Sequence, residues 1–269
     1  MDLSVTDFNV RLRTIRLREV ILAAIIAFNV AMVIVVFLPM FEGFEEYVFA
    51  IFMVLLILFF AWALRGTHGL KDNFSQIFER EYSREILYVL IINFIFAMFI
   101  VSFFATIDAF SNPIAEPISE MVEASSGYMG TWVFILEIFS AIILAPIIEE
   151  LFFRGVLFNR LKIRTGLIIA MLVSSFLFAI GHEFGGMTSA FLFGMCMCII
   201  YYKTDNILLT MTIHCLNNLI GTIFDFTTLP DILMEMPWLI ITCIISGICG
   251  ILILLYIYKN LKAFRSAND

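Results

Sequence analysis

The chain has 269 residues, of which 62% are hydrophobic and 14% are charged, and its formal net charge at pH 7 is −7. A soluble globular domain is about half apolar and about a quarter charged, so this composition indicates an integral membrane protein. The excess of acids over bases argues against nucleic acid as a partner, because nucleic-acid binding requires clustered basic surface.

Eight apolar stretches approach or exceed the length of about 20 helical residues that crosses a bilayer. In chain order they cover residues 20–39, 47–65, 86–107, 131–159, 166–184, 188–203, 207–224 and 237–258. They predict an all-α fold, a polytopic membrane bundle of about eight transmembrane helices. We expect residues 1–269 to form one integral membrane domain, in contact with membrane lipids.

The basic residues predict the orientation of the bundle. With eight crossings, all 16 Lys and Arg residues fall on one side of the membrane. The opposite loops carry only acids, namely Glu42, Glu45, Glu46, Asp108, Glu116, Glu120, Glu123, Asp225, Asp231 and Glu235. Because cytoplasmic loops are rich in Lys and Arg, both termini are expected in the cytoplasm. Two amphipathic segments, 1–19 and 66–85, are expected to lie along the cytoplasmic interface.

Three short polar patterns interrupt the apolar second half of the chain. They are Glu149-Glu150-x-x-x-Arg154, Phe178-x-x-x-His182 and His214-x-x-x-Asn218. A titratable side chain inside a membrane costs at least a few kcal/mol, so such residues are candidates for a functional site by default.

The first pattern assigns different environments to its two acids. Adjacent residues on a helix point about 100° apart, so Glu149 and Glu150 cannot both face one cavity. Glu150 precedes Arg154 by four residues, which is the favourable order for a helical ion pair. Glu149 is then the freer carboxylate and suits a general base. The alternative is a purely structural ion cluster. Pro146 removes one backbone hydrogen bond and predicts a kink beside the acids.

The other two patterns supply imidazole and amide groups. Phe178 is expected to pack against the ring of His182, one helical turn away. His214 and Asn218 share a helix face, where they could stabilise an oxyanion or clamp two helices together. His182, His214 and a carboxylate could also form a zinc site. The same groups can perform hydrolysis with no metal and no cofactor, which is the interpretation we favour.

In this order and spacing, the three patterns resemble the CAAX-protease and bacteriocin-processing family of intramembrane glutamic endopeptidases, to which the Ras-converting CAAX protease belongs. The resemblance covers residues 140–224, which would be the motif-bearing catalytic core. It implies that Glu149 activates a water molecule that His182 helps to hold. It also implies an oxyanion hole formed by His214 and Asn218.

Within the same resemblance, Glu150 and Arg154 match the supporting pair of the first motif. One feature conflicts with a shared site. Counted from the cytoplasmic ends at about 1.5 Å per residue, Glu149 and His214 lie roughly 10–16 Å deep but His182 lies about 24 Å deep. The three can meet only if helix 166–184 starts below the surface, tilts strongly or ends elsewhere.

The resulting hypothesis is an intramembrane endopeptidase of a bacterial plasma membrane. Its substrate would be a membrane-associated peptide or protein, such as a leader peptide, a peptide pheromone or a lipidated CAAX-type C-terminus. One alternative is a non-proteolytic scaffold, immunity or regulatory protein that keeps the polar residues for helix packing. Another is a transporter that uses the acids as a proton relay, although no repeat of two related halves is found in the sequence.

Overall fold

The computed structural model describes residues 7–37, 45–78, 80–111, 131–183 and 185–266. These residues are almost entirely helical, and no strand is formed within them. Some of the expected features lie partly outside these ranges. They are the interfacial segments (residues 1–6 and 79), the apolar stretches 20–39 and 166–184 (residues 38–39 and 184) and, among the outer acids, Glu42, Glu116, Glu120 and Glu123. The expected all-α fold is confirmed.

The helices, in chain order, have the following bounds. They are α1 (Phe8–Thr14), α2 (Leu17–Phe37), α3 (Glu45–Ala63), α4 (Leu70–Gln76), α5 (Arg80–Ala97), α6 (Phe99–Ser111), α8 (Thr131–Phe139), η3 (Ser140–Leu144), α9 (Ala145–Glu149), η4 (Glu150–Phe158), α10 (Asn159–Thr165), α11 (Leu167–Ala179), α12 (Met187–Thr204), α13 (Ile207–Asp225), α14 (Leu229–Met234) and α15 (Trp238–Ser266). The elements η3 and η4 are π-helical.

Within the described residues, six helical stretches are long and apolar enough to cross a membrane. They are Leu17–Phe37, Ser83–Ser111, Thr131–Thr165, Met187–Thr204, Ile207–Asp225 and Trp238–Ser266. Two further apolar helices, Tyr47–Ala63 and Leu167–Ala179, are shorter. Each of these eight corresponds to one apolar stretch of the sequence, so the polytopic bundle is confirmed. Eight crossings and cytoplasmic termini stay predictions.

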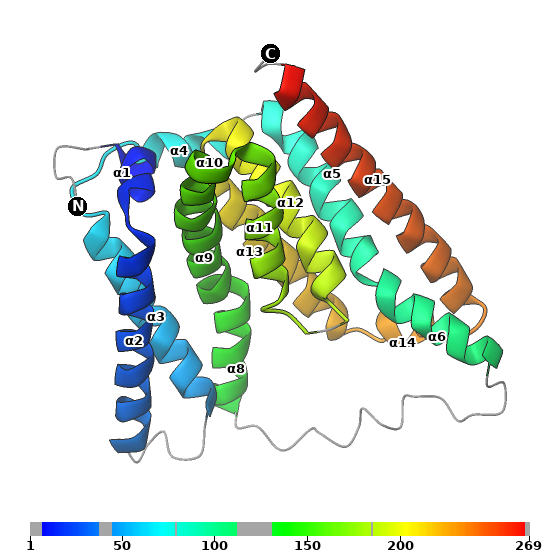
Figure 1. The fold of residues 1–269 in the computed structure, drawn as a ribbon. Coiled ribbons are helices and arrows are strands. Elements are labelled where there is room, and N and C mark those ends of the chain that lie inside the picture. The colour runs from blue at the N-terminus through cyan, green and yellow to red at the C-terminus, as the bar shows by residue number, and fades with distance from the viewer. Residues whose placement is uncertain (1–6, 38–44, 79, 112–130, 184, 267–269) are drawn as a thin grey trace.

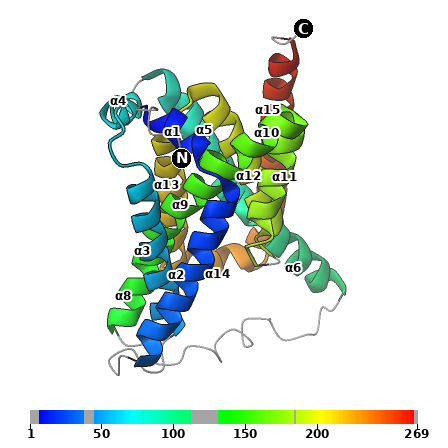
Figure 2. The same ribbon diagram turned by 60° about the vertical axis from the view of Figure 1, so that its left-hand side comes forward.

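The motif-bearing helices occupy the middle of the bundle (Figure 1). The α2–α3 hairpin packs on one side of them, where α3 contacts α8 and α9 (Figure 2). On the other side, α15 packs against α5 and α6. Between these two groups, α8 to α10 form one long irregular helix, and α11 and α12 form a tightly packed antiparallel pair. This arrangement brings the three polar patterns together from α9, η4, α11 and α13.

Helix α11 is shorter than the sequence predicted. It was expected to continue to residue 184, but it ends at Ala179, and the chain then forms a turn in which the His182 N–H donates to the Ala179 carbonyl. Glycines at 181, 185 and 186 explain the early end, because glycine weakens a helix interior by about 1 kcal/mol relative to alanine. The expected boundary was therefore wrong.

The early end shortens α11 but does not by itself raise His182 to the level of His214. The Phe178 ring contacts both imidazole rings, which shows that the two histidines lie in one cluster. The 13 residues of α11 rise about 20 Å, which is less than the hydrocarbon core of about 30 Å. Gly166 starts the hairpin with a positive φ of 82°, so α11 turns back directly beside α10. In Figure 1 the connection between α11 and α12 lies well above the lower end of α8. His182 therefore stands at the tip of a hairpin that ends inside the bundle.

Helix α1 packs at the end of the bundle where α4 and α10 lie (Figure 2). Its Leu12 and the following Ile15 are fully buried. Arg160 of α10 donates hydrogen bonds to the Thr14 and Ile15 carbonyls at 2.8 and 3.0 Å. Arg11 donates to the Ala63 carbonyl at 3.2 Å. This part of the first interfacial segment is thus bound to protein, and its position at the membrane interface stays a prediction.

Candidate active site

A fully buried ion pair lies at the centre of the site. The Arg154 guanidinium contacts the Glu150 carboxylate, with Nη1 2.9 Å from Oε1, and both side chains have zero exposure. Both residues lie on η4, at the i, i+4 spacing that predicted the pair. Two ions removed from water cost several kcal/mol each, so such a pair persists only when further contacts satisfy it.

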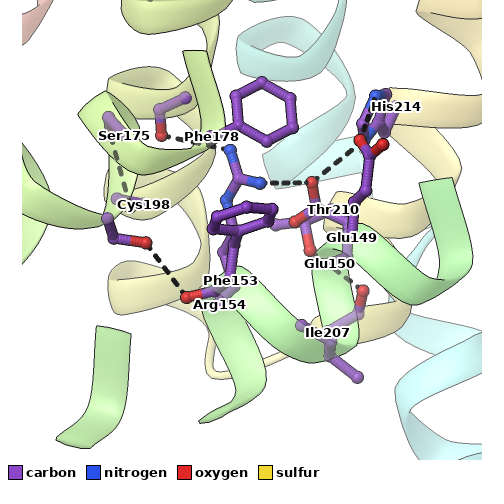
Figure 3. Close-up of polar contacts among 12 residues, drawn as sticks. Glu149, Glu150, Phe153, Arg154, Ser175, Phe178, Cys198, Ile207, Thr210 and His214 are labelled. Atoms are coloured by element: carbon purple, nitrogen blue, oxygen red, sulfur yellow. Dashed lines mark hydrogen bonds and ion pairs between the residues drawn. The ribbon is translucent and has the colours of Figure 1, made fainter. Parts of the chain in front are cut away.

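Those further contacts come from α11 and α12 (Figure 3). Arg154 Nη2 donates to the Gly194 carbonyl on α12 at 3.4 Å, and the guanidinium lies 4.5 Å from the centre of the Phe178 ring on α11. Glycine at position 194 permits the close approach of α12 to α11, because a Cβ there would lie only 3.0 Å from Ser175 Cβ. The close approach of α11 and α12 thus places both partners around Arg154.

His214 of α13 reaches the same carboxylate from the other side. Its Nδ1 lies 3.1 Å from Glu150 Oε1, and Nδ1 must donate because an ionised carboxylate only accepts. The side chain is 3% exposed, and the rings of Phe178 and Phe193 surround it at centroid distances of 5.6 and 5.2 Å. Glu150 therefore holds Arg154 and His214 at once, and it orients His214 Nε2 away from the ion pair.

Glu149 occupies a different environment from its neighbour. It is the last residue of α9, and its side chain is 31% exposed. Its Oε2 lies 3.7 Å from His214 Nε2, which is beyond a hydrogen bond but close enough for a shared small partner. The structure thus separates a buried carboxylate from an accessible one, as the helical geometry of the first motif predicted.

His182 lies on the accessible side of the cluster. Its ring centroid is 4.7 Å from that of Phe178, the packing that the sequence predicted, and its Nδ1 lies 3.0 Å from the Phe178 carbonyl. The centroid of the Phe178 ring also lies 5.6 Å from that of the His214 ring. One phenyl ring therefore contacts both imidazole rings. Among the described residues, no direct hydrogen bond joins His182 to Glu149.

Asn218 contacts the backbone of the long helix, where its Nδ2 donates to the Ala141 carbonyl at 2.8 Å. Local helix geometry explains this acceptor. The Ala145 N–H bonds the Ser140 carbonyl five residues back, and the next donor in that register would be Pro146, which has no N–H. The helix clamp that the sequence left open is therefore present. One proton of the amide nitrogen remains for another acceptor.

Several contributors were not singled out from the sequence. Phe193 and Gly194 lie in an apolar stretch with no polar signal, and Ala141 is an ordinary apolar residue. Pro146 was the one available signal, since it indicated a backbone carbonyl in need of a donor. In the part of the chain that the structure describes, no group of three or more His, Cys, Asp or Glu side chains is placed to hold a metal ion.

Comparison with known proteins adds one match. A family model described as "Rce1-like: Type II CAAX prenyl endopeptidase Rce1-like" matches residues 131–220, from the first residue of α8 into α13. This segment contains all three polar patterns. Neither the curated proteins nor the solved structures yield a match. The match confirms, for residues 131–220, the resemblance to the CAAX-protease and bacteriocin-processing family that the motifs carry.

Proposed function

We propose that this protein is an intramembrane glutamic endopeptidase in which Glu149 is the general base. The single observation that carries the proposal is the separation of the two adjacent acids. Glu150 is fully buried against Arg154 and His214, whereas Glu149 is 31% exposed and lies 3.7 Å from His214. A structural ion cluster uses one carboxylate, and the accessible second one remains available for chemistry.

In the proposed reaction, Glu149 takes a proton from a water molecule as the water oxygen bonds to the substrate carbonyl carbon. The carbonyl oxygen becomes an oxyanion. The C–N bond then breaks, and Glu149 returns the proton to the leaving amine. Since water is the nucleophile, no covalent acyl-enzyme forms.

The oxyanion would be stabilised by His214 and Asn218. His214 already donates its Nδ1–H to Glu150, so Nε2 can donate only when the ring is protonated on both nitrogens. The neighbouring Glu149 and Glu150 compensate that positive charge, and with Arg154 the four side chains are then electrically balanced. Asn218 would use the amide proton that Ala141 does not take. Removing one such donor typically lowers kcat about 10²–10³-fold.

His182 would hold the water. With Nδ1–H donated to the Phe178 carbonyl, its Nε2 carries a lone pair that can accept a hydrogen bond from water. Its exposure at the hairpin tip supports this role, because water has to arrive from an open side. Phe178 fixes the ring between this water and the buried ion pair.

The substrate would be a membrane-associated peptide or protein. The matched family is named for a CAAX prenyl endopeptidase, so a lipidated C-terminus is one candidate, together with leader peptides and peptide pheromones. The apolar helices make this an integral membrane protein. We propose the plasma membrane of a bacterium as its location.

The test compares peptides released by cells or vesicles containing wild type, Glu149→Ala, Glu149→Gln or the control Glu235→Gln, read by mass spectrometry. Glu235 is an exposed acid that follows α14, outside the motifs. Both Glu149 variants should lose at least about 10²-fold in cleavage, the usual contribution of a general base. They should fold normally, and the control should match wild type. Full cleavage by Glu149→Ala would exclude the proposal. Full biological function of Glu149→Gln would favour the scaffold.

A further inference from the structure

Glu137 is a carboxylate inside an apolar span, and the proposed mechanism does not use it. It lies in α8, within the membrane-length stretch Thr131–Thr165, and its neighbours Phe134, Ile135 and Phe139 are apolar and exposed. An ionisable side chain in such a segment is costly and is a functional candidate by default.

Among the residues that the structure describes, no charged partner offsets this cost. Glu137 is exposed, and in the described part of the chain none of the ion pairs includes it. It differs in this respect from Glu85, which Lys203 contacts at 2.7 Å, and from Glu150, which Arg154 contacts. A carboxylate kept for packing would be expected to have such a partner. An exposed one without a partner is suited to bind a cation from outside the chain.

The position of Glu137 on α8 places it beside the seam between α8 and α13. Two contacts mark this seam, the Phe134–Phe226 ring pair at 5.6 Å and the Asn218–Ala141 hydrogen bond at 2.8 Å. Glu137 lies one helical turn from both Phe134 and Ala141, between the two contacts. It is therefore one turn away from the backbone carbonyl that Asn218 holds.

The facing turn of α13 leaves space at this level. The residues that follow Asn218 by one turn are Gly221 and Thr222, and a Cβ added to Gly221 would meet no atom within 4 Å. Thr222 turns its hydroxyl back to the Asn218 carbonyl at 2.8 Å. Next to Glu137, the seam is thus bordered by a glycine with open space around its Cβ position and by a threonine whose hydroxyl already has a partner.

We propose that Glu137 is a specificity-determining carboxylate that binds a Lys or Arg side chain of the substrate peptide. The inference rests on the proposed function. Glu137 precedes Glu149 by 12 residues, or about 18 Å along the helix axis. An extended peptide advances about 3.3 Å per residue. The basic residue of a preferred substrate should therefore lie about five residues from the bond that is cleaved.

The test uses purified protein in vesicles of neutral phosphatidylcholine and a set of synthetic apolar peptides of 20 residues, each carrying one Lys, Glu or Gln at a scanned position. Mass spectrometry gives kcat/KM and the cleaved bond for each peptide. Wild type should prefer Lys about five residues from that bond by about tenfold, mainly through KM. Glu137→Gln should remove this preference, and Glu137→Lys should transfer it to the Glu peptides. The matched control is Asp231→Asn, an exposed acid on α14 that should leave the preference intact.

The outcomes separate this inference from the proposed function. Glu149→Ala should cleave none of the peptides, and if it cleaves them the general-base assignment fails. If cleavage depends on Glu149 but wild type shows no charge preference, or Glu137→Gln keeps a Lys preference, only the Glu137 assignment fails. Glu137→Gln is close to isosteric, so its result stands even if the charge reversal impairs folding.

Discussion

The two sides of the motif cluster differ in how deeply their charged and polar side chains are buried. On the closed side, Glu150 and Arg154 are fully buried, contact each other and are covered by α11, α12 and α1. On the open side, Glu149 and His182 retain exposure and unsatisfied hydrogen-bonding capacity. The difference teaches that two adjacent, identical residues acquire different roles through their rotation about one helix. The closed side positions the groups, and the open side has capacity left for a substrate.

The largest effect should follow from removing the cation of the closed side. Arg154→Ala leaves Glu150 buried without its main counter-charge, and breaking a buried pair in this way typically costs about 3–5 kcal/mol. We expect little folded protein, measured as monodisperse yield and thermal unfolding in detergent. Arg154→Lys keeps the charge but loses the planar contact with Phe178, so its loss should be smaller.

The corresponding change on the open side is Glu149→Ala. In contrast to Arg154→Ala, this variant should lose activity at a nearly unchanged unfolding temperature. If Arg154→Ala unfolds like wild type, the closed side has no structural role and the contrast between the two sides is wrong.

The second effect should come from the contact between α1 and η4. A Cβ at Gly155 would lie 2.7 Å from Leu12 Cδ2, so Gly155→Ala forces α1 or η4 to shift next to Arg154. Overpacking of this kind typically costs about 1–3 kcal/mol. Activity should fall with stability, because η4 carries the ion pair that orients His214.

Leu12→Ala provides the matched test, since it removes the three carbons that the new Cβ would meet. In a double-mutant cycle, measured by thermal unfolding and peptide cleavage, the double variant should be less impaired than the sum of the single variants, with a coupling of about 0.5–3 kcal/mol. Additive losses would show that Leu12 does not press on Gly155.

Sequence patterns predicted the parts of this molecule that depend on local periodicity. The apolar stretches located the spans, and the i, i+4 spacing paired Glu150 with Arg154. They failed where tertiary contacts decide. The hydropathy of 166–184 concealed the helix end at Ala179, although the glycines from 181 onward could have indicated it. The burial of Leu12 depends on a glycine more than 140 residues away, which no local pattern shows.

The smallest effect should separate two roles of Asn218. Its amide satisfies a carbonyl that Pro146 cannot, so Asn218→Ala should cost about 1 kcal/mol of stability for the lost hydrogen bond. In a Pro146→Ala background the restored N–H can donate to that carbonyl, and the same substitution should then cost less. Cleavage should behave differently. If Asn218 also stabilises the oxyanion, the double variant regains stability while its kcat stays about 10²–10³-fold low.

Thermal unfolding and single-turnover cleavage of the four proteins in this cycle distinguish the alternatives. Recovery of both stability and kcat in the double variant would make Asn218 a helix clamp alone, and the oxyanion would then rely on His214. Recovery of stability without recovery of kcat would assign Asn218 two roles. One amide proton would bond the Ala141 carbonyl, and the other would stabilise the oxyanion. The hydrogen bond to Ala141 would then also orient the second amide proton, because it fixes the plane of the amide.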